Sequence, residues 1–231
     1  MKNETKIDLI KTTDTIDMME VEKKGGKNGE LAPSFWRTIR SLKNVHRLDL
    51  LKCVYDAEGT LGVVKLAAEA GLTESVASIY LRMLNARGLI SVKRDAKHVY
   101  YGTAPDRSLP TAISLQEGFR RFFATDPTKG WQKRLIKLLD GFSHYNRINI
   151  IRFLVVASNP SRAQLVKAAG VCEKTFGHHF TKLRAANLIE SVRIGNRVVG
   201  YRIPKQNNPL AIILLEEATK NLERANKSWD S

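Results

Sequence analysis

Side chains that could hold a metal ion or act as nucleophiles are few in this sequence and lie far apart. There are two cysteines, Cys53 and Cys172, and five histidines. A metal site needs thiolate ligands, or histidine and carboxylate ligands, at a coordinated spacing, and the sequence has no such cluster. It also has no glycine-rich phosphate loop, no paired nucleophile and base, and no group of carboxylates for a nuclease metal. We therefore expect no enzyme activity, no metal site and no cofactor.

Positive charge is the more informative chemical feature. The 231 residues include 38 Lys and Arg against 23 Asp and Glu, which gives a formal net charge of +15 and a pI of about 9.9. Residues 33–129 hold fifteen basic and nine acidic residues, and residues 130–231 hold seventeen and seven, whereas residues 1–32 are slightly acidic. This excess favours a polyanionic partner, most simply nucleic acid. A well-solvated basic surface without a ligand is the alternative.

Composition predicts a globular protein of the cytoplasm. Hydrophobic residues make up 43% of the chain and charged residues 26%, which is ordinary for a folded domain. No apolar run approaches the ~20 residues of a membrane-spanning helix, and the N-terminal residues lack the apolar core of a signal peptide. Two cysteines cannot form a disulfide framework, which fits a reducing compartment. We expect no membrane partner.

The elements that would position the basic side chains are encoded twice. The stretch LNARGLI at 84–90 returns as LRAANLI at 183–189. When Arg47 is set against Arg147, apolar positions match at the i, i+3, i+4, i+7 spacing of a buried helix face. The match continues over about sixty residues, which indicates an internal repeat. The predicted organisation is an arm at 1–32, a first unit at 33–123, a linker at 124–130 and a second unit at 131–231.

Each unit reads as helix, helix, turn, helix and two short strands, followed by a closing helix. Gly71 and Gly170 are typical of helix C-termini, and Thr73 is a good N-cap. In the first unit we expect helices at 46–57, 62–70, 74–87 and 109–123, with strands at 90–94 and 99–103. In the second we expect helices at 146–157, 161–169, 173–186 and 209–225, with strands at 190–194 and 198–202. This predicts a mainly α fold with small β-hairpin wings (α+β), built as two tandem winged helix-turn-helix domains.

These residues resemble the ArsR-type winged-helix regulators. LKNVHRLDLLKCVYDAEG and LAAEAGLTESVASIYLRMLNARGLISVKRDAKHVYY follow the pattern of that family, which has an Arg-Leu opening, an AxxLG-like turn, SxxLxxL and a GL[IV] exit. The second unit is looser, because His178-His179-Phe180 stands where the family has a small polar residue, His and Leu. The resemblance covers most of 34–123 and 131–225. It implies a nucleoid-associated DNA-binding transcriptional regulator, here a repressor, of a prokaryote, its mobile elements or a virus. It also implies relatives that dimerise through their first and last helices.

The fourth helix of each unit and the hairpins supply the candidate DNA contacts. In the fourth helices, the positions expected to face the core are Ala77, Tyr80, Leu81 and Leu84, and Phe176, His179, Phe180 and Leu183. The outer faces carry Ser75, Ser78, Ile79 and Arg82 in the first unit, and Lys174, Thr175, Gly177, His178, Thr181 and Lys182 in the second. Small polar residues followed by cations suit a helix in the major groove. The hairpins offer Lys93, Arg94, Lys97 and His98, and Arg193, Asn196 and Arg197, which could reach phosphates or the minor groove. A merely solvated face or turn is the alternative.

The remaining histidines and cysteines are expected to be structural. His179 replaces Tyr80 in a packed position, whereas His46 and His144 begin helices and have no visible partner. Cys172 stands at a helix N-terminus and is read as an inert small residue, with a redox switch as the alternative.

Apolar residues exceed what two separate small cores would bury. They crowd the helices that flank the linker and the closing helix of the second unit, as Phe119, Phe122, Phe123, Leu135, Ile136, Leu138, Leu139, Leu210, Ile212, Ile213, Leu214 and Leu215. We therefore expect the first and last helices of the two units to pack together as an intramolecular pseudo-dimer, with a further homodimer possible in principle. The expected partner is double-stranded DNA, read as an imperfect palindrome or a direct repeat. The alternatives are a winged-helix module that binds a protein, and a plasmid replication initiator that binds origin repeats.

Overall fold

The computed structural model describes residues 35–57, 59–96, 98–104, 109–125 and 128–227. The arm expected at 1–32 and the wing residue Lys97 lie outside the described residues.

The chain is mainly helical with small antiparallel strand pairs, which is an α+β fold. The first half comprises α2 (Phe35–Ser41), α3 (Val45–Asp56), β1 (Leu61–Gly62), α4 (Val63–Glu69), α5 (Glu74–Asn85), β2 (Ser91–Asp95), β3 (His98–Gly102) and α6 (Pro110–Thr125). The second half comprises α7 (Trp131–Phe142), α8 (Tyr145–Val156), α9 (Arg162–Ala169), α10 (Glu173–Ala185), β4 (Glu190–Ile194), β5 (Arg197–Arg202) and α11 (Pro209–Lys227).

Apart from β1, the same order of elements occurs in both halves. The bounds of every helix and strand whose range was expected from the sequence lie within two residues of that range. Local chemistry explains where the helices stop and start. Gly71 and Gly170 adopt left-handed backbone angles, with φ of +64° and +63°, at the ends of α4 and α9. The hydroxyl of Thr73 accepts a hydrogen bond from the Val76 amide at 3.5 Å and begins α5. Ser161 and Gln164 form a reciprocal capping box at the start of α9.

The two hairpins differ at one edge. In the first half, β2 and β3 pair antiparallel, with Val92 opposite Tyr101, and β1 pairs with the other edge of β3. The sequence analysis did not predict β1, which is only two residues long. In the second half, β4 and β5 pair alone with a bulge at Val192 and Arg193. There, a single hydrogen bond of 3.1 Å from the Tyr201 amide to the Pro160 carbonyl replaces the short strand.

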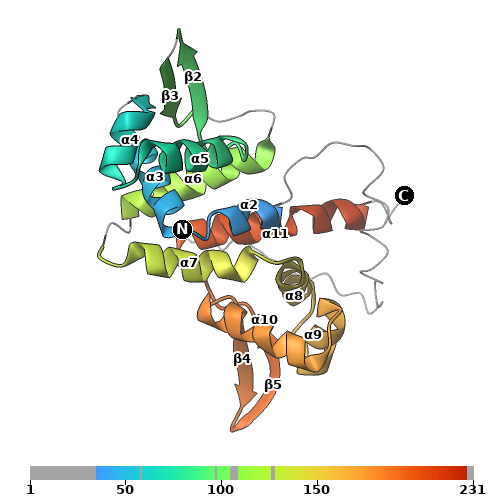
Figure 1. The fold of residues 1–231 in the computed structure, drawn as a ribbon. Helices are drawn as coiled ribbons and strands as arrows, with labels where there is room; N and C mark the ends of the chain where they lie inside the picture. Colours follow the sequence, from blue (N-terminus) through green and yellow to red (C-terminus); the bar gives the residue numbers. More distant parts are fainter. Residues whose placement is uncertain (1–34, 58, 97, 105–108, 126–127, 228–231) are drawn as a thin grey trace, which may run out of the picture.

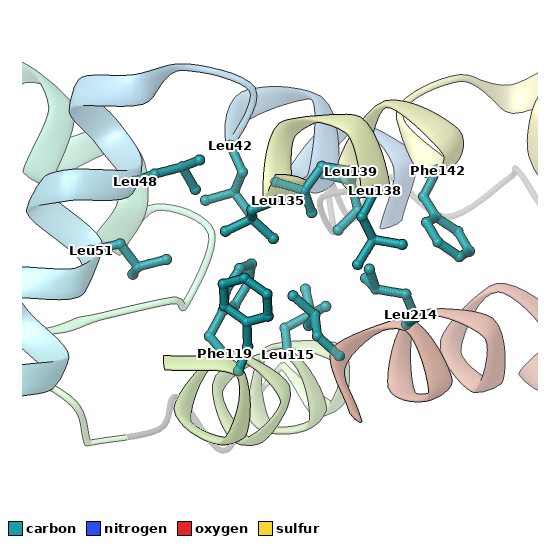
Figure 2. Packing of buried hydrophobic residues seen from close by; sticks show 14 of the residues in the cluster. Leu42, Leu48, Leu51, Leu115, Phe119, Leu135, Leu138, Leu139, Phe142 and Leu214 are labelled. Atoms are coloured by element: carbon teal, nitrogen blue, oxygen red, sulfur yellow. The ribbon is translucent and has the colours of Figure 1, made fainter. Parts of the chain in front are cut away.

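One hydrophobic core joins the two halves. Helix α6 packs along α11, and α2 packs on α7. Figure 2 shows Leu115 and Phe119 of α6 facing Leu135 of α7 and Leu214 of α11, and all four side chains are fully buried. Helices α6 and α11 approach closely at Gly118, where an added Cβ atom would lie 2.7 Å from Cδ1 of Leu210. Most of the apolar surplus noted in the sequence is therefore buried between the first and last helices of the halves, whereas Ile212 stays exposed.

The hairpins point away from this shared core. In Figure 1 the β2–β3 hairpin projects from one end of the molecule and the β4–β5 hairpin from the opposite end, while α2, α7 and α11 run through the middle. Helices α4 and α9 likewise lie on opposite sides of the centre. Helices α4 and α5 with the β2–β3 hairpin therefore lie across the shared core from α9 and α10 with the β4–β5 hairpin. The outer faces of α5 and α10 carry exposed side chains.

Candidate nucleic-acid interface

Helix α5 has the buried and exposed faces that its sequence predicts. Ala77, Leu81 and Leu84 are buried, and Tyr80 is half-buried beneath the guanidinium of Arg47, 5.4 Å from its ring centroid. The opposite face carries the predicted contact residues: Ser75, Ile79 and Arg82 are exposed, and Ser78 is half-buried.

Two further residues of this outer face were missed in the sequence analysis. Val76 is 36% exposed and Met83 is 40% exposed, beside Ile79 at 48%. The three positions follow i, i+3 and i+7, so they form one apolar stripe along the helix. The same spacing rule, applied outward from Ile79, would have found both. Arg82, the cation of this face, lies back along the helix, because its Nε donates a 3.3 Å hydrogen bond to the Ser78 carbonyl.

Helix α10 presents a polar and basic outer face. All the predicted contact residues are exposed: Lys174, Thr175, His178, Thr181 and Lys182. Three of them also have partners within the protein. The hydroxyl of Thr175 lies 3.3 Å from the Cys172 sulfur, and Thr181 donates a 2.9 Å hydrogen bond to the Gly177 carbonyl. Lys182 pairs with Asp140 at 2.9 Å. Among the described residues, no side-chain hydrogen bond or ion pair engages Lys174 or His178.

The hairpin tips expose the predicted cations. Lys93 and Arg94 of β2 are exposed, as is His98 of β3. In the second hairpin Arg193, Asn196 and Arg197 are all exposed around Gly195, whose φ of +57° forms the turn. At the base of this hairpin Arg202 pairs with Glu190 at 2.7 Å, so its charge is partly neutralised. The uncompensated charge of β4 and β5 therefore lies at the tip.

A polar network that the sequence did not reveal holds α10 in place. Asp140 of α7 pairs with Lys43 of the α2–α3 turn, with Lys182 of α10, and with Arg147 of α8 at 3.6 Å. Burial acts to raise the pKa of Asp140, but hydrogen bonds from Lys43 and Lys182 and their charges outweigh it, so the pKa lies below its ordinary value. One carboxylate thus links α10 to α7, to α8 and to the first half of the chain.

His179 lies behind the outer face of α10 and is 7% exposed, which confirms its expected packed position. Its Nδ1 lies 3.3 Å from Nη1 of Arg147, so a neutral imidazole accepts this hydrogen bond. Burial, followed by the charges of His144, Arg147 and His178, lowers the pKa of His179 to about 4. The expectation that His144 has no partner is wrong. Its Nδ1 accepts a 3.2 Å hydrogen bond from the Asn146 amide, and its ring lies 4.6 Å from that of His179.

The cysteines take different environments. Cys53 is half-buried, and burial is the main cause that raises the pKa of its thiol. Cys172 is exposed, and the hydrogen bond with the Thr175 side chain is the main cause that lowers its pKa. Within the described part of the chain, no three His, Cys, Asp or Glu residues are placed to hold a metal ion. No described helix is both long enough and apolar enough to cross a membrane.

Comparison with known proteins gives one informative similarity. A stretch of 91 residues is 32% identical to the nodulation protein NolR of Rhizobium meliloti. The stretch makes up 39% of this chain and 70% of NolR, so it has about the length of one half of the chain. No protein-family model and no solved structure matches the chain.

Proposed function

This chain belongs to the family of the nodulation protein NolR, and from that premise we propose that it is a transcriptional regulator that binds double-stranded DNA sequence-specifically. The observation that carries the proposal is the pairing of each exposed helix, α5 and α10, with a hairpin that has exposed cations at its tip. A helix that follows a tight helix–turn–helix connection and stands beside a basic hairpin has the geometry of a recognition helix with a wing.

In this proposal the chain is two tandem winged helix-turn-helix domains, at 33–123 and 131–231, joined by a linker at 124–130 and preceded by an arm at 1–32. Helices α4 and α5 form the helix-turn-helix of the first domain, and α9 and α10 form that of the second. The left-handed glycines at the ends of α4 and α9 support this assignment, because they create the turn that each motif requires. The repeated order of elements supports it as well.

We further propose that the two domains form a pseudo-dimer within one chain. The packing of α6 on α11 and of α2 on α7 supports this, because the first and last helices of the halves then act as a dimer interface. The two recognition helices would read an imperfect palindrome or a direct repeat whose half-sites lie about one helical turn apart, ~34–36 Å. The protein would act as a repressor on the nucleoid, in the cytoplasm. Exposed Ile113 and Ile212 on the closing helices would serve a further homodimer.

A protein-binding module is the second candidate function. The apolar stripe of Val76, Ile79 and Met83 on α5 favours it, since winged helices with exposed apolar faces can also hold protein partners. The basic surface favours DNA instead, because a module that only holds a protein has no need of a net charge of +15.

A salt titration tests the proposed function. Affinity for a duplex of mixed sequence should fall steeply with salt, with a slope of about −0.9 per phosphate neutralised. The double variant Arg193→Ala/Arg197→Ala removes two cations of the second hairpin and should make the slope shallower by about 2. Arg120→Ala/Arg121→Ala removes the same charge from exposed positions of α6 and serves as the control, which should leave the slope unchanged. A flat salt response of the unmodified chain would contradict DNA binding.

A further inference from the structure

The outer faces of α5 and α10 differ in chemistry at equivalent positions. Ninety-nine residues separate equivalent positions of the two helices, as the pair Leu84 and Leu183 shows. The apolar stripe of α5 has a polar or basic counterpart at every position on α10, and a small hydroxyl residue on α5 is matched by a cation. The pairs are Val76 and Thr175, Ile79 and His178, Met83 and Lys182, and Ser75 and Lys174.

This difference is not imposed by packing. All eight side chains are exposed. Lys182 pairs with Asp140 within the fold, but packing places no demand on the polarity of the other seven. Ile79, at 48% exposure, keeps apolar surface in contact with water, which is unfavourable unless a partner covers it. On the core-facing sides Ala77, Leu81 and Leu84 have apolar equivalents in Phe176, Phe180 and Leu183, although the side chains differ in size. On the outer faces the apolar stripe of α5 has no apolar equivalent on α10. The divergence therefore concerns what each helix recognises.

The major groove of DNA offers two matching chemistries. The C5-methyl group of thymine is an apolar group at the edge of the groove, and aliphatic side chains pack against it. The O6 and N7 atoms of guanine are acceptors that bind a lysine ammonium. On α5 the competing cation, Arg82, is hydrogen-bonded back to the Ser78 carbonyl. On α10 Lys174 has no side-chain partner among the described residues and stands in the first turn, at the end of a recognition helix that contacts base edges.

We propose that the two recognition helices read different bases: α5 packs its apolar stripe against thymine methyl groups, and α10 binds guanine through Lys174 and His178. This inference rests on the proposed function and deepens it. It means that the operator has a thymine-rich half-site and a guanine-containing half-site, and that one chain binds it in a single orientation. A dimer of identical subunits cannot make this distinction, because both of its helices carry the same side chains.

The test starts from duplexes selected from random sequence by the full chain. Thymines of one half-site are then replaced by uracil, which removes only the methyl group, and guanines of the other half-site by 7-deazaguanine, which removes only N7. Replacing thymine by uracil in the half-site that α5 binds should weaken binding about fourfold for each methyl group contacted, since burying one such group contributes ~0.8 kcal/mol. Uracil in the other half-site should have no effect. Loss of N7 under α10 should weaken binding by about tenfold, within the range of a specific base contact.

Protein variants assign each half-site to its helix. Ile79→Ala should reduce the sensitivity to uracil and leave that to 7-deazaguanine intact, and Lys174→Ala should do the reverse. Both residues are exposed, so neither change should disturb folding. The inference would be overturned if the selected sites had two identical half-sites, or if neither uracil nor Ile79→Ala changed the affinity. The apolar stripe would then be assigned to a protein partner, and the proposal of DNA binding would still hold. Failure to bind any duplex at low salt would instead overturn the proposed function itself.

Discussion

Replacing Gly177 with alanine should stabilise the fold and weaken DNA binding at the same time. Gly177 lies inside α10, where glycine is unfavourable because it gives up more backbone freedom on folding than any other residue. A Cβ atom added there would meet nothing within 4 Å, and the backbone angle is not of the left-handed kind. Alanine therefore fits without strain. The expected gain is about 0.5–1 kcal/mol in the free energy of unfolding, or an increase of about 1–4 °C in Tm.

A matched control is available in a neighbouring helix. Gly141 of α7 is also helical, but a Cβ atom there would overlap Cδ1 of Leu188 and lie 2.9 Å from Cβ of Ala186. Gly141→Ala should therefore lose about 1–3 kcal/mol through overpacking. Urea unfolding followed by circular dichroism measures both variants. If Gly177→Ala were destabilising, the side of α10 that carries Gly177 would not be open, and the outer face would have been misplaced. If it stabilised the fold without weakening DNA binding, α10 would not approach DNA at this residue.

Three further outcomes are expected. His179 takes up a proton near pH 6.5 in the unfolded chain but only near pH 4 in the folded chain, so the free energy of unfolding should fall as the pH drops between these values, by up to ~1.4 kcal/mol per pH unit for one proton. In urea unfolding, His179→Gln should flatten this pH dependence. An unchanged pH profile would contradict the buried neutral imidazole. Asp140→Ala should cost about 3–5 kcal/mol, because it leaves the buried guanidinium of Arg147 without its counter-charge, and a loss below ~1 kcal/mol would refute the network. In competition binding Lys174→Ala should relax sequence preference, whereas Arg197→Ala should weaken all sequences alike, and equal effects would mean that the recognition helix is misassigned.

The local elements could be predicted because short-range chemistry determines them. Apolar spacing placed the helices, Gly71 and Gly170 ended two of them, and alternating residues gave both hairpins. Strand β1 could not be predicted, since two residues carry no periodic signal and their pairing depends on the exposed edge of β3. The packing of the closing helices could be predicted from an excess of apolar residues that two separate small cores would leave exposed.

The side-chain network behind α10 was beyond the reach of the sequence. Asp140 and Lys182 are far apart in the chain, and their pairing depends on how α7 crosses α10. The same holds for His144 and His179, whose contact requires the final placement of two helices. Val76 and Met83 are a different case, because helical periodicity alone places them beside Ile79.

The most direct test of the central claim is a footprint on a selected duplex, combined with the stoichiometry of the complex. One chain should protect two half-sites whose centres lie about 10–10.5 base pairs apart, because in the proposed complex α5 and α10 each occupy one major groove. Arg193→Ala/Arg197→Ala should weaken protection at one half-site more than at the other. Protection of a single half-site by one chain, or of two half-sites only when two chains are bound, would contradict the account of two DNA-reading helices in one molecule.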